Sequence, residues 1–307
     1  MVSARIEILT HWIKREEGSH WVFAAFHVMA QPGGKCRAWP GRSTAMRHLA
    51  VARSFLVAAI LPIFEMPPPA VDSYLADLAA REPSFHARLV EVAVRSLGTP
   101  YADGPLGEGP EGAYDRDPLI DLTRADCVTF VEQTVALAAS PSYEEALNTL
   151  QRIRYRNGKI SFVTRHHFMI SDWIANSTFC RDVTQDLGVP TRTISRTISR
   201  KDFFKRMGAP GAARDTPDRP VRLTYVASAD VRSAEKNLGS PALIIFVGKI
   251  EWLFALHCGF YVRDQEGKGL LYHASSKVGH VAATNFVDYV ENSSRYLGFT
   301  AYEISEP

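Results

Sequence analysis

From residue 72 onward the chain shows two kinds of hydrophobic pattern, and the first of them is helical. Apolar residues recur every three or four positions across 84–97 and stop at Gly98, which predicts a helix that ends in a glycine turn. The same spacing predicts a second helix from about Asp126. A third opens with a capping sequence at 142–145 and ends at about Gly158. A loop rich in Gly, Pro and Asp, residues 101–125, separates the first helix from the second.

Beyond residue 158 the pattern changes to the short runs that are typical of strands. A loop of Gly, Ala, Pro and charged residues at 208–220 interrupts these runs. Because the helices come first and the strands follow, the pattern predicts an α+β fold. The strands we expect are 159–165, 221–226, 242–247, 255–262, 270–275 and 300–304.

The first 70 residues lack this regularity. A basic stretch from Met46 is followed by the apolar run 54–64 and then by three prolines, which is the layout of a secretory signal. An ordinary amphipathic or buried helix is the alternative, because Pro62 interrupts the run and no small-x-small cleavage site is visible.

The signal interpretation has consequences for the whole chain. It predicts that translation begins at Met46, that residues 1–45 are a mis-assigned extension, and that 46–70 is the signal segment. A single catalytic domain then spans 71–307. The protein is expected to be periplasmic or secreted, and cytoplasmic if 46–70 is not a signal.

Composition excludes several classes of protein. The 307 residues contain 35 Lys and Arg against 33 Asp and Glu, a net charge of +2, so there is no electrostatic case for non-specific nucleic-acid binding. Four cysteines are too few for a disulfide scaffold of this size, and none forms the C-x-x-C pair of a zinc ribbon. No apolar run is long enough for an ordinary membrane span, so stable membrane insertion is not expected.

Cys127 is the residue whose position calls for a chemical explanation. It falls in the first turn of the second predicted helix, directly after a polar loop. Unpaired N–H groups and the helix dipole favour negative charge there, which lowers a thiol pKa and raises the fraction of nucleophilic thiolate. A small buried cysteine without a chemical role is the alternative. A base close to Cys127 is needed to decide between the two.

Two histidines on a predicted hairpin are the candidates for that base. Strand alternation places His257 on one face and Cys258 on the other, in the core. If the hairpin register sets His273 opposite His257, the two side chains share a face with Cβ atoms about 5 Å apart. One histidine can then deprotonate Cys127 while the other fixes its orientation. A register slip of one residue would place them on opposite faces.

A third polar cluster lies at 165–173. Its adjacent histidines, His166 and His167, point to opposite sides of an extended chain, and a metal would need a third ligand from elsewhere, so metal binding is not favoured. Arg165 is suited to a substrate carboxylate and Trp173 to a sugar face, which predicts contact with substrate. A structural polar corner is the alternative.

On these residues the chain resembles the NlpC-type papain-like cell-wall hydrolases. It looks most like the branch of N-acetylmuramoyl-L-alanine amidases that act on 1,6-anhydro-muropeptides. The resemblance covers about residues 85–304, and the segment around Cys127 is its most specific part. The matching segments are Gly98-Thr99-Pro100-Tyr101, Leu106-Gly107, Asp126-Cys127-Val128-Thr129-Phe130-Val131-Glu132, Arg154-Tyr155-Arg156-Asn157-Gly158, Arg165-x-His167-Phe168, Asp172-Trp173, His257-x-Gly259 and His273-Ala274-Ser275.

The resemblance implies a papain-like cysteine hydrolase fold, with N-terminal helices packed on a mostly antiparallel sheet or half-barrel. It implies that Cys127 is the nucleophile, His257 the base and His273 the third polar member. The family hydrolyses the amide between the lactyl group of anhydro-muramic acid and L-Ala through an acyl-enzyme, without a metal or another cofactor, and its partners are peptidoglycan fragments (muropeptides). The implied substrate-binding residues are Tyr101, Asp126, Arg165, His167 and Trp173.

The sequence departs from the family pattern before the base. The Gly-Asp step expected ahead of the first catalytic strand reads Gly-Ser-Pro at 239–241, and no Asp lies among residues 254–256 just before His257. These changes leave substrate preference open. Three alternatives remain: an endopeptidase that cuts within the stem peptide, a transferase that uses the same triad, and a non-catalytic muropeptide-binding protein.

Overall fold

The computed structural model describes residues 10–14, 21–25, 61–213, 217–251 and 253–307. The chain divides into two compact units, Met1–Val51 and Ala52–Pro307, which are described separately. In the first, β1 (Thr10–Lys14) and β2 (Trp21–Ala25) form an antiparallel pair. Most of the expected extension over 1–45, and residues 46–60 of the expected signal segment, lie outside the described residues.

The end of the apolar run at 54–64 is part of the second unit. Ile63 lies in a short 3₁₀ turn, Ile63–Glu65, and is only 3% exposed, while Met66 joins it in the core. α2 (Pro68–Arg81) starts two residues later with prolines in its first turn, where the missing N–H costs no helical hydrogen bond. Residues 61–70 therefore fold with the rest of this unit.

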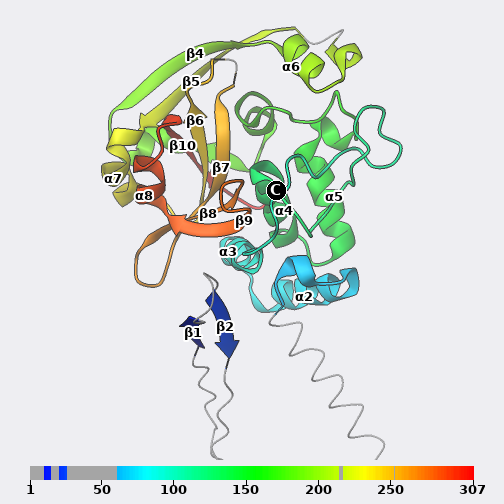
Figure 1. The fold of residues 1–307 in the computed structure, drawn as a ribbon, viewed down its shortest axis with the longest axis vertical. Helices are drawn as coiled ribbons and strands as arrows, with labels where there is room; N and C mark the ends of the chain where they lie inside the picture. The colour runs from blue at the N-terminus through cyan, green and yellow to red at the C-terminus, as the bar shows by residue number, and fades with distance from the viewer. Residues whose placement is uncertain (1–9, 15–20, 26–60, 214–216, 252) are drawn as a thin grey trace, which may run out of the picture. The chain divides into compact units, whose positions relative to one another are not determined.

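The predicted helices are present and pack together on one side of a sheet (Figure 1). α3 (Phe85–Arg95) is capped by Ser84, and α4 (Cys127–Ala138) is in contact with α3, with α5 (Tyr143–Arg154) and with two strands. Ser142 accepts a hydrogen bond from the N–H of Glu145 and so caps α5. α5 ends at Arg154, earlier than predicted, because Tyr155 is already extended, and Asn157 and Gly158 then adopt positive φ in the short turn Arg156–Gly158.

The rest of the described unit builds an eight-stranded, antiparallel sheet in the order β4-β5-β10-β6-β7-β8-β9, with β3 beside β10. The α+β fold predicted from the sequence is therefore confirmed. The strands are β3 (Cys180–Asp182), β4 (Thr191–Ile198), β5 (Arg219–Ala227), β6 (Ala242–Gly248), β7 (Ala255–Arg263), β8 (Gly269–Ser275), β9 (His280–Asn285) and β10 (Tyr296–Ile304), and the short helices are the π-helical turn Met169–Ile174, α6 (Arg200–Arg206), α7 (Val231–Ala234) and α8 (Phe286–Glu291).

Five of the six predicted strands are found, and one prediction is wrong. Residues 159–165 form turns, because the hydroxyl of Thr164 and the backbone of Ser161 bond to each other and close the chain on itself. In the eight-stranded sheet the sequence analysis missed three strands, β3, β4 and β9, and it also did not predict β1 and β2 of the first unit. In Figure 1, β4 and β5 form a long ribbon that reaches toward α6.

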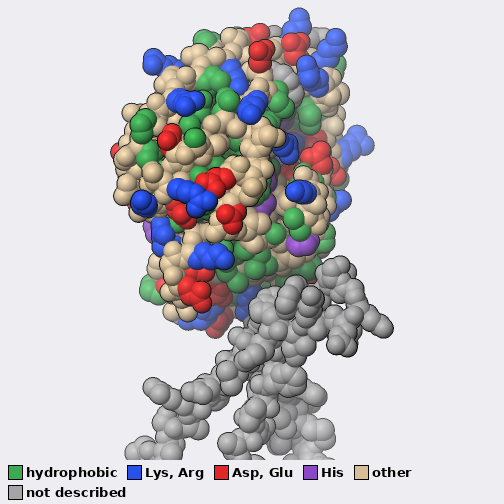
Figure 2. Space-filling model, turned by 60° about the vertical axis from the view of Figure 1, so that its left-hand side comes forward, with side chains coloured by type: hydrophobic (Ala, Val, Ile, Leu, Met, Phe, Trp, Pro, Cys, Tyr) green, Lys and Arg blue, Asp and Glu red, His purple; other side chains and the backbone are tan. Residues whose placement is uncertain are grey.

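The central strand β6 is buried on both faces, which explains its apolar character. Leu243 and Ile245 pack on the side of α2–α5, while Ile244 and Phe246 pack on the side of α7 and α8. Figure 2 presents one face of the surface, on which Lys and Arg side chains are interspersed with Asp and Glu. Within the described ranges, no helix has the length and apolar character that crossing a membrane requires.

Candidate active site

Cys127 is the first residue of α4, as the sequence predicts. Asp126 fixes this start through a capping box: its Oδ1 accepts from the Thr129 N–H at 2.7 Å, and its own N–H donates to Thr129 Oγ1 at 2.9 Å. The other carboxylate oxygen of Asp126 accepts from the Gly104 N–H at 3.1 Å. Asp126 is thus engaged by the backbone on both oxygens and holds the turn that presents Cys127.

The two histidines of the hairpin share a face and are in contact. His257 Nε2 lies 2.7 Å from His273 Nδ1, and the two rings are nearly perpendicular. The register differs from the predicted one by two residues, because Phe260 pairs with Tyr272 and Gly259 consequently comes opposite His273. An even shift keeps both histidines on the predicted face.

Gly259 provides the space that this register needs. A Cβ at position 259 would lie 2.5 Å from the Tyr272 carbonyl oxygen and 2.9 Å from the His273 Cβ. A side chain here would therefore displace β8 or His273. On the other side of the pair, Leu256 is the extra residue where the β6–β7 register shifts, and such a bulge re-aims the neighbouring side chain, here His257.

His273 sits in an almost closed environment. It is 1% exposed, its ring meets that of Tyr289 edge-on at 4.8 Å, and its Nε2 lies 3.4 Å from Thr284 Oγ1. Burial lowers the pKa of His273 to about 3, and the positive charge that His257 carries when protonated contributes a smaller part of this shift. His273 is accordingly neutral near pH 7 and suited to orient His257 rather than to carry charge.

The thiol of Cys127 lies between a second thiol and an imidazole. Hydrogen bonding to Cys258 is the largest cause that lowers the pKa of Cys127, and hydrogen bonding to His257 is a smaller one. Together they hold this pKa well below its usual value although the thiol is buried. The pKa of Cys258 is raised, by its bond to Cys127 and by burial. The helix start favours negative charge on Cys127 and not on Cys258, which is in the middle of a strand. Cys258 lies in the core, as predicted, and its Sγ donates to the Cys127 carbonyl at 3.1 Å.

Cys127, His257 and Tyr101 line one cavity of about 390 Å³. The N–H of Tyr101 donates to the Gly279 carbonyl at 2.9 Å, and Tyr101 pairs with Ala125, so the segment before the helix is tied to the β8–β9 turn. Burial and the nearby negative charge of Cys127 raise the pKa of Tyr101 to about 12, so its hydroxyl stays protonated. The remaining walls are the β8–β9 turn at 275–277 and the α8–β10 connection at 292–296.

The structure does not bring Arg165, His167 and Trp173 to this cavity. Arg165 is paired with Glu108, at 2.7 Å from its Nε, and with Asp115, and it lines a separate cavity of about 530 Å³. His167 Nε2 lies 2.6 Å from the Phe162 carbonyl oxygen, and its ring packs among phenylalanines. Trp173 is 1% exposed, so in this structure its ring is packed in the core and presents no face to a ligand. This segment is the structural polar corner that the sequence left as the alternative.

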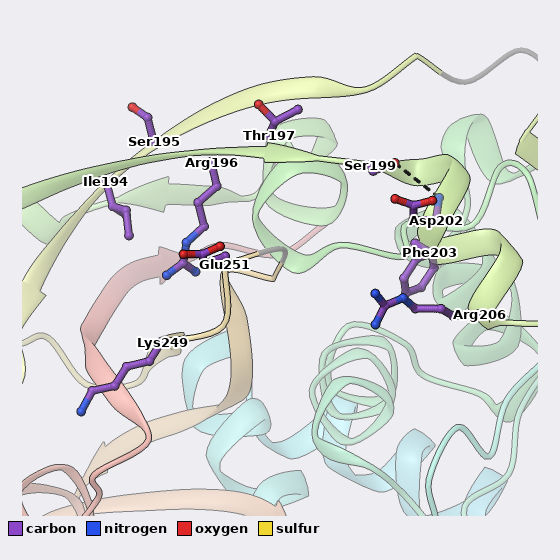
Figure 3. Close-up of a pocket in the computed structure, with 10 residues that line it drawn as sticks. All are labelled: Ile194, Ser195, Arg196, Thr197, Ser199, Asp202, Phe203, Arg206, Lys249 and Glu251. Carbon is purple, nitrogen blue, oxygen red and sulfur yellow. Dashed lines mark hydrogen bonds between the residues drawn. The ribbon is translucent and has the colours of Figure 1, made fainter.

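A larger cavity, about 710 Å³, lies between β4, α6 and the β6–β7 connection (Figure 3). Ile194 and Arg196 point into it from β4, whereas the side chain of Thr197 points away (Figure 3). Arg196 donates to the carbonyl oxygens of Gly248 and Leu253, both at 2.8 Å, and so ties the β6–β7 connection to β4. No cysteine or histidine of the described chain lines this cavity, so it has no thiol–imidazole pair like the one at Cys127.

Comparisons with known proteins agree with this geometry. The family model of the AmiA-like, N-acetylmuramoyl-L-alanine amidase-like proteins matches residues 91–299, a span that includes Cys127, His257 and His273. No curated protein matches the chain.

Several solved structures share the fold. Protein LPG0564 from Legionella pneumophila superposes with a TM-score of 0.69 at 20% identity, over 79% of this chain and 95% of that one. An N-acetylmuramoyl-L-alanine amidase from Bacteroides uniformis gives 0.57 at 22% identity, over 72% and 99%. A putative xylanase from Bacteroides fragilis gives 0.55 at 24% identity, over 69% and 99%. At these identities the likeness establishes the fold alone.

Proposed function

Because the chain belongs to the N-acetylmuramoyl-L-alanine amidase-like family, we propose that it is a cysteine amidase that acts on peptidoglycan fragments. The bond hydrolysed is the amide between (1,6-anhydro-)N-acetylmuramic acid and L-alanine. The observation that carries the proposal is the meeting at one cavity of Cys127, at a helix start, with His257, whose Nε2 is bonded to the buried His273.

The first half of the reaction forms an acyl-enzyme. His257 takes the thiol proton, and the Cys127 thiolate attacks the lactyl carbonyl carbon to form a C–S bond. His257 then returns the proton to the L-Ala nitrogen as the C–N bond breaks and the stem peptide leaves as an amine. Because Nε2 of His257 faces His273, its Nδ1 is the ring nitrogen left to face Cys127.

The negative oxygen formed during attack needs donors that are already in place. The first intrahelical bond of α4 is donated by the Phe130 N–H to the Asp126 carbonyl, at 2.9 Å. The N–H groups of Cys127 and Val128 precede that bond, which makes them the donors for the oxyanion. The protonated hydroxyl of Tyr101, on the same cavity, is a third.

In the second half, water hydrolyses the thioester. His257 accepts a proton from the water, whose oxygen bonds to the lactyl carbon, and the C–S bond breaks to return Cys127. The products are a free muramic carboxylic acid and the stem peptide. No step of this sequence requires a metal, and in the part of the chain that the structure describes no group of three or more His, Cys, Asp or Glu is arranged to hold one.

Mass spectrometry of the products tests the function. Wild-type protein and Cys127→Ala are incubated with anhydro- and reducing-end muropeptides of the same stem. Release of the intact stem peptide, abolished in Cys127→Ala, is the expected result. Cleavage inside the stem would instead identify an endopeptidase. Comparison of the two sugars shows whether the anhydro ring is needed.

We also propose that the protein is secreted or periplasmic, through a signal segment that begins at Met46. The support is the basic stretch followed by the apolar run at 54–64. Because Ile63 is packed in the core, this proposal shortens the signal segment expected over 46–70, so that cleavage precedes the turn at Ile63–Glu65. N-terminal sequencing of the native protein tests this, and a mature chain that begins at Val2 would contradict it.

A further inference from the structure

The cavity of Cys127 carries positive charge without any compensating acid. Among the described residues that line it, Lys277 and Arg295 are cations, and none is Asp or Glu. Apart from Cys127 and His257, the remaining polar side chains are hydroxyls and one amide, and the hydroxyls of Tyr289 and Tyr296 are 3.0 Å apart, bonded to each other. With two cations against the single thiolate of Cys127, the cleft favours a negatively charged ligand.

The two cations come from separate connections with defined backbones. Lys277 lies on the β8–β9 turn, which is closed by the Gly279 N–H donating to the Ser275 carbonyl at 2.8 Å. Arg295 lies between α8 and β10, and its carbonyl accepts from the Lys249 N–H at 3.3 Å. Both side chains are exposed to solvent at the cavity. The backbone hydrogen bonds of these two connections fix the positions from which the side chains of Lys277 and Arg295 reach the cavity.

These two cations differ from three buried arginines of the described chain. Arg154, Arg165 and Arg200 each pair with a carboxylate inside the fold. Lys277 and Arg295, in contrast, make no ion pair with any carboxylate in the described ranges. Their charges are therefore available to a ligand.

We propose that Lys277 and Arg295 form a subsite for a carboxylate of the substrate, and that they select stem peptides with a free carboxylate close to the scissile amide. This inference rests on the proposed amidase function and deepens it by naming what the leaving peptide must carry. A guanidinium binds a carboxylate through two parallel hydrogen bonds, and an ammonium adds a second positive charge. The pair also offsets the repulsion between a carboxylate ligand and the Cys127 thiolate.

Converting that carboxylate to an amide removes its charge and leaves the shape of the ligand nearly unchanged, so the two forms make a matched pair for the test. The glutamate that follows L-Ala bears a free α-carboxylate, whereas isoglutamine in the same place bears a neutral amide of nearly the same shape. Loss of one charge in a cleft with two unpaired cations is expected to lower kcat/KM by about 10- to 100-fold, since charge-assisted hydrogen bonds are about twice as strong as neutral ones.

The test compares anhydro-muramoyl-L-Ala-D-Glu with its D-isoglutamine analogue, both with the γ-carboxyl group blocked as a methylamide, so that the α-carboxylate is the only charge that differs between the two ligands. Wild-type protein, Lys277→Met, Arg295→Met and the double variant are assayed by product mass, with Lys268→Met and Arg222→Met as controls. Lys268 and Arg222 are exposed and lie outside the cavity, on the β7–β8 turn and on β5. In the double variant we expect the ratio of kcat/KM for the D-Glu ligand to that for the D-isoglutamine ligand to fall toward one, because only kcat/KM for the D-Glu ligand decreases. Both controls should keep the wild-type ratio.

A binding measurement separates this inference from the proposed function. Calorimetry of both ligands on Cys127→Ala needs no turnover, and we expect tighter binding of the D-Glu form. Equal hydrolysis and equal binding of the two ligands would overturn the carboxylate subsite and leave the amidase intact. Tighter binding of the D-Glu form without hydrolysis of either would overturn the amidase and support the subsite. Failure of both ligands to bind and to react would overturn both.

Discussion

Two regions of this protein combine histidines with arginines, and they differ in what those side chains already contact. At the cavity of Cys127, His257 and Arg295 face open space, and only His273 is fully enclosed. In the corner at 165–173, Arg165 is paired with two carboxylates and Trp173 is buried. The residue types are alike, but the first region keeps polar groups for a ligand and the second uses them within the fold.

This difference shows that residue types alone do not identify a ligand site. The contacts that each side chain already makes within the protein must also be known. An ion pair such as Arg200–Asp172, with both side chains less than a tenth exposed, holds the corner together and costs much to break. The half-buried pair Cys127 and His257 does little for the core and is open to a substrate. Changes in the first region are accordingly expected to affect reaction rate, and changes in the second to affect stability.

The largest effect is expected at His257. His257→Gln removes the group that takes and returns the proton, which lowers kcat/KM by about a thousandfold. The free energy of unfolding should change by less than about 1 kcal/mol, because the side chain is only half buried. Steady-state kinetics and urea unfolding measure the two quantities. If His257→Gln lowered the free energy of unfolding but kept the activity, the role of His257 would be structural and not catalytic.

Asp172→Asn is the corresponding test of the corner. It leaves the buried Arg200 guanidinium without its partner and is expected to lower the free energy of unfolding by about 3–5 kcal/mol. The activity of the folded protein should stay within about twofold of the wild type. Removing both charges, in Asp172→Leu with Arg200→Met, should restore part of the loss, because no unpaired charge then remains. If Asp172→Asn lost kcat a thousandfold while its free energy of unfolding stayed at the wild-type value, the corner would have a catalytic role and the two regions would not differ as proposed.

A smaller effect is expected at Gly259, which connects packing to chemistry. In Gly259→Ala the new Cβ would meet the Tyr272 carbonyl and the His273 Cβ, so His273 has to move relative to His257. Misplacement of about 1 Å at a catalytic group costs about 100-fold in rate, so a loss of about 10- to 100-fold in kcat is expected. Gly239→Ala is the control, because a Cβ there meets open space. Equal kinetics for the two variants would mean that the histidine contact is dispensable.

Just below pH 6.5 the smallest effect is expected, a pH slope of stability that both regions share. Burial lowers the pKa of His273 and of His167 to about 3, from the ordinary 6.5. As the pH falls from 6.5 toward 3, the unfolded chain binds protons that the folded chain refuses, so stability falls by up to about 1.4 kcal/mol per pH unit for each histidine. His167→Gln and His273→Gln should each flatten this slope in unfolding measurements. Activity at pH 7 should be retained in His167→Gln and lost in His273→Gln.

The sequence predicted those parts of the site that depend on local signals. The capping residues Asp126 and Thr129 and the polar loop before them place Cys127 at a helix start, whatever lies around it. Alternation along β7 puts His257 and Cys258 on opposite faces, and this survives the change of register. The register itself was missed by two residues because the Asp264–Lys268 turn sets it, through hydrogen bonds that alternation does not encode.

Other features depend on tertiary contacts that no local pattern carries. Trp173 reads as a sugar platform in sequence, yet the fold packs it against Phe179 in the core. β4 was missed because it is an edge strand with polar residues on both faces, so it has no apolar alternation to detect. The contact of Cys258 with the Cys127 carbonyl joins residues 131 positions apart, and only the packing of α4 on β7 creates it.

The activated thiol at Cys127 is the central claim, and site-resolved alkylation tests it most directly. The protein is treated with iodoacetamide over pH 5–8 and digested, and the modified fraction of each cysteine is measured by mass spectrometry. Cys180 is the internal control, because burial raises its pKa to about 11. The account predicts that Cys127 reacts at pH 6, far faster than Cys180 and Cys258, and that His257→Gln slows it. Reaction of Cys127 at pH 6 no faster than that of Cys180 would contradict the account.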